Sequence, residues 1–273
     1  MNESEIRNPV TAMAESDATG EVAEIFADIR ETMEIPLLTS IWRILVDIEG
    51  GLRSSWDATK QLYQTGQPQA ALLRIRAETA LPMPQPITIS QLARVGVNRQ
   101  DLSVIRSILA AYNRSNGLNL IALTALSVSP VGQPANGHLP LGSPLWPPFP
   151  SLLGPERIPA ETWSLLHRIH NLSAVSKKTG HLATVWRHLA SWPGLLELIY
   201  AGMEPLARTG AIRRSMQQMQ DWAQREGACI AHLKTGTGSI PKEAGDLIAS
   251  YAKKVHHIVT MGHSVACWLE TVK

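Results

Sequence analysis

The side chains best suited to chemistry lie along one short predicted helix. In the stretch HLATVWRH at residues 181–188, helical spacing places four side chains on one face: His181, Thr184, Val185 and His188. An imidazole with an ordinary pKa of about 6.5 can serve as a general base near neutral pH. The stretch therefore predicts a polar, ligand-facing surface. The alternative for His181 is a structural role as a cap at the helix start.

Other candidate motifs are weaker. His167 and His170 have a spacing that zinc ligands can have, but no Glu or Cys nearby completes a ligand set, which favours solvated or capping histidines. The TGTGS run at 235–239 follows no predicted strand and lacks the Lys-Ser/Thr of a phosphate loop. We therefore expect no metal site and no cofactor.

The helix at 181–188 repeats an earlier segment. The sequence LLTSIWRILVDIEGGL at 37–52 matches HLATVWRHLASWPGLL at 181–196 at six of sixteen positions, with a constant offset of 144 residues. This offset is about half the chain, so it predicts a duplicated helical unit rather than a short-period solenoid. In the first copy the ligand-facing positions are mostly apolar: Leu37, Ser40, Ile41 and Ile44. The asymmetry indicates that one copy keeps a packing face while the other faces a ligand.

Apolar residues recur at helical spacing almost throughout the chain, and no alternating strand with a hairpin turn is evident. The exception is residues 129–159, which carry nine prolines and cannot be helical. We predict an all-α, pseudo-two-fold fold in which repeats at 1–128 and 160–273 pack as one unit, joined by this Pro-rich crossover. A disordered linker is the alternative for 129–159.

Composition excludes several classes. The net charge is +2 and the basic residues are dispersed, which argues against a nucleic-acid partner. No apolar run approaches the roughly 20 residues that span a bilayer, so no membrane partner is expected. The first residues lack the pattern of a signal peptide. We expect a cytoplasmic protein with both cysteines free, and a homodimer is an open alternative.

The chain resembles the group I 2-haloacid dehalogenases, an all-helical family acting on both D- and L-2-haloacids. The resemblance runs from about residue 20 to about residue 265, and six motifs carry it in order: IFADIRETMEIP at 25–36, IWRIL at 41–45, ILAAYNRSNGLNLIALTALS at 108–127, SPVG at 129–132, LASWP at 189–193 and EPLARTG at 204–210. It implies two helical repeats of about 130 residues with the active site between them. In the family an Asp activates a water that attacks the halogen-bearing carbon directly.

The resemblance assigns roles to only some positions. Asn116 matches the Asn that helps hold the water, and Thr184 matches the Ser that contacts substrate. The Asp position, however, is occupied by Val185, which cannot accept a proton. The pocket aromatics fall on Leu37 and Ser40, and the pocket Tyr falls on Lys254 or Val255. A general base contributes about 10²–10⁴-fold to a rate, so the family's reaction cannot transfer unchanged.

We therefore predict a dehalogenase-like enzyme for a small carboxylate substrate, with displacement at a carbon that bears a leaving group. The reaction is non-hydrolytic in the first hypothesis, for example an intramolecular cyclisation. The alternatives are a hydrolytic dehalogenase whose base has moved to His181 or His188, and a non-catalytic binding or scaffold protein. The predicted catalytic residues are His181, Asn116 and Thr184, and the predicted substrate-binding residues are Ser40, Leu37, Asn113, Val185 and His188.

Overall fold

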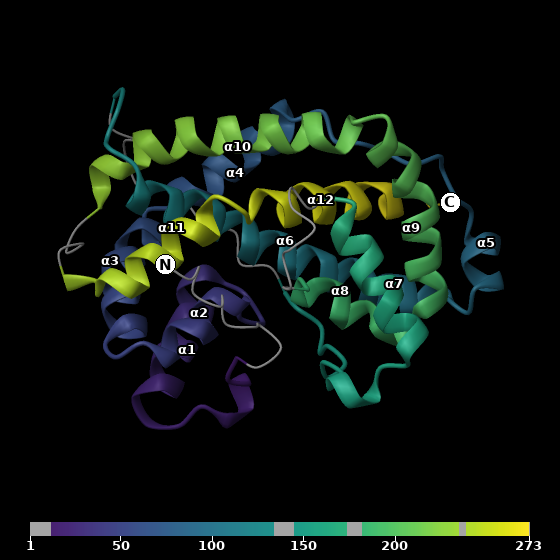
Figure 1. Cartoon of the computed structure of the whole chain (residues 1–273), viewed down its shortest axis with the longest axis horizontal. Coiled ribbons are helices and arrows are strands. Elements are labelled where there is room, and N and C mark those ends of the chain that lie inside the picture. Colours follow the sequence, from purple (N-terminus) through teal and green to yellow (C-terminus); the bar gives the residue numbers. More distant parts are fainter. Residues whose placement is uncertain (1–11, 134–144, 174–181, 235–238, 273) are drawn as a thin grey trace, which may run out of the picture. The chain divides into compact units, whose positions relative to one another are not determined.

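The computed structural model describes residues 12–133, 145–173, 182–234 and 239–272. Over these ranges the chain is helical, with no strand (Figure 1), which confirms the predicted all-α class. No helix in the described ranges is both long and apolar enough to cross a membrane.

The chain forms two compact units, and each one draws on three separate segments. Unit 1 comprises Met1–Thr79, Arg114–Pro144 and Met219–His256, and unit 2 comprises Ala80–Asn113, Leu145–Gln218 and His257–Lys273. The long helices α6 (Arg99–Ser127) and α10 (Ala211–Ile230) contribute residues to both units. The units therefore cut across the sequence halves at 1–128 and 160–273.

Unit 1 contains five further elements that matter below. They are α1 (Gly20–Met33), α2 (Ser40–Ile44), α3 (Gly51–Gln64), α4 (Gln67–Glu78) and α11 (Lys242–Ala252). Unit 2 contains α5 (Ile89–Arg94), α7 (Ala160–Asn171), α8 (Thr184–His188), α9 (Pro193–Arg208) and nearly all of α12 (His256–Glu270). Single 3-10 turns extend some of these, notably Leu45–Asp47 after α2 and Leu189–Ser191 after α8.

Helix boundaries recur at the offset seen in the sequence. Helices α2 and α8 begin 144 residues apart, as do the 3-10 turns that follow them. Helices α3 and α9 end at the same offset, and α4 and α10 begin at it. The offset also pairs two tryptophans that are completely buried, Trp42 and Trp186. How the two copies face one another stays a prediction.

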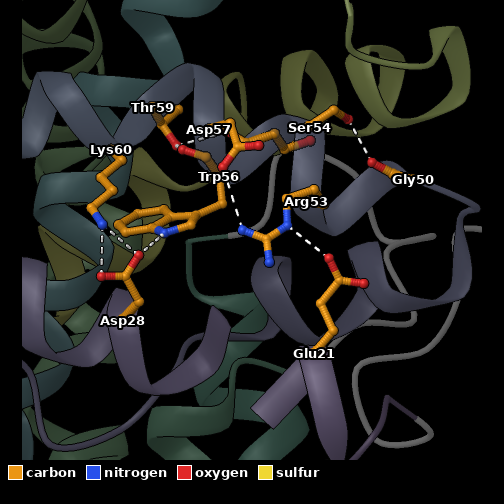
Figure 2. A network of polar contacts seen from close by, with 10 residues as sticks. Glu21, Asp28, Gly50, Arg53, Ser54, Trp56, Asp57, Thr59 and Lys60 are labelled. Atoms are coloured by element: carbon orange, nitrogen blue, oxygen red, sulfur yellow. Dashed lines mark hydrogen bonds and ion pairs between the residues drawn. The ribbon is translucent and has the colours of Figure 1, made fainter. Parts of the chain in front are cut away.

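Unit 1 is organised by the packing of α3 against α1 (Figure 2). Residues at helical spacing bury one face of α3, and Trp56 is the largest of them. The indole Nε1 of Trp56 donates to the Asp28 carboxylate at 2.7 Å, and Lys60 Nζ donates to the same carboxylate at 2.8 Å. At the exposed edge, Arg53 donates to Glu21 at 2.9 Å. These contacts fix the rotation of α3 and hence the direction in which Tyr63 points.

In unit 2, helix α9 packs closely against neighbouring elements. Helix α7 packs along α9, and α9 begins beside the turn after α5. A Cβ on Gly194 would lie 2.4 Å from the carbonyl oxygen of Val95, so only glycine fits there. Residues 145–154 run without helix or strand, and their Pro150 carbonyl enters the site described next.

Candidate functional site

His188, the last residue of α8, is held between two partners. Its Nε2 lies 2.8 Å from the carbonyl oxygen of Pro150, and its Nδ1 lies 3.2 Å from the hydroxyl of Tyr112 on α6. A carbonyl can only accept, so Nε2 carries the proton and Nδ1 presents its lone pair to the Tyr112 hydroxyl, which donates. The geometry thus fixes one tautomer of a neutral imidazole.

The surroundings keep that imidazole neutral. Burial lowers the pKa of His188 below 6.5, and the charge of Arg187 lowers it further, against the opposing effect of the Pro150 carbonyl. Two rings also pack edge-on to the imidazole: Tyr112 at 5.8 Å and Phe149 at 6.2 Å between centroids. At neutral pH the imidazole of His188 is therefore a base. Its proton-accepting nitrogen, Nδ1, is hydrogen-bonded to the hydroxyl of Tyr112.

Of the other residues predicted on α8, Thr184 is polar and Val185 is apolar. Thr184 opens α8 and is half-buried. Val185 is only 1% exposed and belongs to the hydrophobic core, so the position that the family resemblance gives to an acid is part of the packing here. His181 lies outside the described residues, so its predicted role stays a prediction.

Asn113 occupies a packing position in unit 2. It is buried, and a Cβ added to Gly262 on α12 would lie 2.2 Å from its Oδ1 atom. Its side chain therefore lies in a tight contact between α6 and α12. The prediction that it binds substrate is not tested by this contact.

Unit 1 holds a second polar cluster, around Asn116. The Tyr251 hydroxyl donates to Asn116 Oδ1 at 3.0 Å. Close by, the Tyr63 hydroxyl donates to Asn119 Oδ1 at 2.8 Å, and Asn119 Nδ2 donates to the Thr39 hydroxyl at 2.7 Å. Burial raises the pKa of Tyr63 and of Tyr251, so both remain neutral phenols. The predicted residues Leu37 and Ser40 lie within two residues of Thr39 in the sequence and are half-buried.

Sequence reasoning missed most of the partners in these clusters. Tyr112 stands in the AYNRSN motif that carried the resemblance, yet only its neighbours were singled out. The phenol of unit 1 comes from Tyr251, one helical turn before the exposed Lys254 and the buried Val255. A short shift in alignment would have found it. No local signal marks Tyr63 or Asn119.

In the described part of the chain, no group of three or more His, Cys, Asp or Glu side chains is arranged to hold a metal ion. His167, one of the two histidines with zinc-like spacing, instead packs edge-on against Trp163 at 5.6 Å between centroids.

The fold is that of the D-2-haloacid dehalogenases. A solved structure of a D-2-haloacid dehalogenase mutant in complex with D-2-CPA superposes with a TM-score of 0.70 at 14% identity, covering 95% of this chain and 93% of that one. A complex of a D-2-haloacid dehalogenase with L-LA gives 0.71 at 14% identity, covering 95% and 94%. No protein-family model matches the chain.

Sequence similarity leads to the same group. A configuration-inverting 2-haloacid dehalogenase of Alcaligenes xylosoxydans xylosoxydans is 26% identical over 209 residues, which are 72% of this chain and 69% of the relative. One from Pseudomonas sp. (strain 113) is 24% identical, over 70% of this chain and 66% of the relative. An (R)-2-haloacid dehalogenase of Rhizobium sp. (strain NHG3) is 23% identical, over 83% and 88%. The chain is thus a relative of the 2-haloacid dehalogenases.

Proposed function

We propose that the protein is a dehalogenase-like enzyme that displaces a leaving group from the carbon next to the carboxylate of a small acid. The similarity to 2-haloacid dehalogenases over most of the chain supports the substrate class. The observation that carries the proposal is the pairing of His188 with Tyr112, because it supplies a base on the same short helix as the inert Val185.

In the proposed mechanism His188 and Tyr112 act together. The phenolic oxygen of Tyr112 takes a proton from the nucleophile while its own proton passes to Nδ1 of His188. The lowered pKa of His188 keeps Nδ1 unprotonated and ready at neutral pH. The Pro150 carbonyl accepts from Nε2 and then stabilises the imidazolium.

The first form of the reaction is non-hydrolytic, because Val185 cannot activate a water. The nucleophile is then a hydroxyl of the substrate itself, on the carbon beside the halide-bearing one. Its oxygen loses a proton to the pair and forms a bond to the neighbouring carbon. The carbon–halogen bond breaks, and the halide leaves with both electrons. The products are an epoxide carboxylate, a halide ion and one proton.

The second form is hydrolytic, and the names of the curated relatives favour it. Here water replaces the substrate hydroxyl. It loses one proton to the Tyr112–His188 pair, and its oxygen displaces the halide to give a 2-hydroxy acid.

Chloride release tests the proposal and separates the two forms. We expect release from 2-chloro-3-hydroxypropionate without ¹⁸O incorporation from labelled water if the reaction is intramolecular. Release from either enantiomer of 2-chloropropionate, with one labelled oxygen in the product, identifies hydrolysis. No release from any of these acids above the uncatalysed rate would contradict both forms and leave the non-catalytic alternative.

Substitutions test the base separately. We expect His188→Gln and Tyr112→Phe each to lower kcat by about 10²-fold or more, the usual contribution of a general base. His167→Gln is the matched control, because His167 lies on α7 and packs against Trp163. It should leave kcat unchanged. Full activity in both site variants would remove the pair from the mechanism.

A further inference from the structure

The Tyr112–His188 pair is buried, although a substrate must touch it to react. Tyr112 is 3% exposed and His188 is 6% exposed. A general base must lie within hydrogen-bond reach of the proton that it takes, so the proposed reaction needs direct contact with the phenol. Some part of the structure over the pair must therefore move before a substrate can reach it.

Residues 145–154, which we call the covering segment, pack against the imidazole. The carbonyl oxygen of Pro150 lies 2.8 Å from Nε2 of His188, and the ring of Phe149 packs edge-on to the imidazole at 6.2 Å between centroids. The ring of Trp146 packs in turn against Phe149, at 6.4 Å between centroids. All of these residues belong to unit 2, so the covering segment and the pair are parts of one compact unit.

The covering segment is held less firmly than a helix. None of its residues is fully buried, and Leu145 at its start is 98% exposed. It forms neither helix nor strand, and Pro147, Pro148 and Pro150 have no N–H group with which to donate a hydrogen bond. Segments with few buried side chains and few backbone hydrogen bonds open at a much lower free energy than core helices do.

The helices that carry the pair are poor candidates for this movement. Tyr112 lies inside α6, a helix of 29 residues, and α8 is fastened to the core by Val185, which is 1% exposed. Displacing either helix would break helical hydrogen bonds or expose core side chains to water. The covering segment can leave the pair without either cost.

From these observations we propose that residues 145–154 form a lid, which moves away from His188 to admit the substrate and closes again before the reaction. This inference rests on the proposed function, because a lid is needed only if the pair acts on a substrate. Opening breaks the hydrogen bond between His188 and Pro150 and separates Phe149 from the imidazole. The closed lid keeps bulk water from the pair, which favours attack by the substrate's own hydroxyl over attack by water.

Chemical labelling of His188 tests the lid in the full-length protein without turnover. Diethyl pyrocarbonate modifies the neutral imidazoles that it can reach, and His188 is the only histidine of its tryptic peptide, residues 188–208. His263 is the comparison, because it is 2% exposed and lies inside α12. We expect His188 to react at least about tenfold faster than His263 at pH 7, at a rate that barely changes in urea below the unfolding transition.

The urea dependence gives the result that would overturn the lid. If His188 and His263 react at equal rates that rise equally steeply with urea, His188 is reached only when the whole protein unfolds. The covering segment is then a fixed part of the fold.

Variants of the covering segment test its opening a second time. Phe149→Ala removes the ring that packs on the imidazole, whereas Trp146→Ala leaves that ring and the Pro150 carbonyl in place and removes only a ring that packs on Phe149. We expect each variant to speed the labelling of His188 about tenfold. Faster labelling in Trp146→Ala reports opening of the lid and not a hole beside the imidazole.

Leu145→Ala is the matched control, because Leu145 lies next to Trp146 in the sequence and is 98% exposed. It should label at the wild-type rate. His263 in the same samples reports any loss of global stability. Wild-type labelling of His188 in both ring variants, with His263 also unchanged, would contradict the lid.

Labelling and chloride release can fail separately. Fast labelling of His188 without chloride release would leave the opening of the lid intact and remove the proposed reaction. Chloride release with His188 labelled no faster than His263 would mean that the substrate reaches the pair by another route, and it would overturn the lid alone.

Discussion

At the scale of single residues, the burial that keeps His188 neutral at pH 7 also makes the folded protein less stable in acid. Its imidazole is buried and neutral, and its pKa lies below 6.5 in the folded protein. Below the ordinary pKa of about 6.5 the unfolded chain binds a proton at this position and the folded chain does not. Stability should therefore fall as the pH drops from about 6.5 towards the lowered pKa.

We expect this effect to disappear in His188→Gln. Over the affected pH window, the wild-type free energy of unfolding should change by up to about 1.4 kcal/mol per pH unit more than that of the variant. Denaturant melts of both proteins between pH 7.5 and pH 5 measure the difference. Parallel pH curves would mean that the folded His188 titrates normally.

Asp28 offers a second residue-scale test, because its carboxylate pairs the buried indole of Trp56 as well as Lys60 (Figure 2). Asp28→Ala leaves the indole N–H without an acceptor, which costs about 1–3 kcal/mol. Asp28→Asn keeps an acceptor and loses mainly a half-exposed ion pair, worth at most about 1 kcal/mol. Urea melts at neutral pH should rank the wild type above Asp28→Asn and Asp28→Asn above Asp28→Ala. Equal losses of stability would indicate that Asp28 stabilises the fold mainly through its ion pair with Lys60 and not through the indole of Trp56.

At the scale of elements, two glycines predict opposite effects of the same substitution. Gly194 at the start of α9 faces the Val95 carbonyl, a backbone atom that cannot move alone, so Gly194→Ala should destabilise by about 1–3 kcal/mol. Gly245 inside α11 has no atom within 4 Å of an added Cβ, so Gly245→Ala should stabilise by about 0.5–1 kcal/mol. Thermal unfolding of both variants checks the pair, and a stabilised Gly194→Ala would show that α9 can shift away from α5.

The positions and boundaries of helices were also what the sequence could predict. Helical periodicity and the offset of 144 residues point to helices and to matching boundaries, because both signals are local or repeat along the chain. The site partners carry no such signal. Tyr112 and His188 are 76 residues apart, and the offset maps His188 onto Ile44, so the repeat itself gives no hint of the pair. Only tertiary packing brings such residues together.

At the scale of the whole molecule, each unit is assembled from three distant segments. Unit 1 takes α11 and part of α10 from the second half of the sequence, and with them Tyr251 and Glu226, the partner of Arg74. Unit 2 takes α5 and the first part of α6 from the first half, and with them Tyr112. Neither half of the sequence contains a complete unit.

This organisation predicts how the chain behaves when it is divided. A fragment of residues 1–128 would expose the apolar surface that α11 covers. It would also leave Asn116 without its hydrogen-bond donor, Tyr251. Burial of apolar area is the main favourable term in folding, so this fragment should not melt cooperatively by itself. The same holds for a fragment of residues 160–273, which lacks Tyr112 and Val95.

Coexpression of the two fragments should recover helical signal and a cooperative transition that neither shows alone. The intact chain is the control, measured by circular dichroism under the same conditions. A sharp thermal transition in residues 1–128 alone would mean that the sequence repeat, and not the three-segment unit, is what folds.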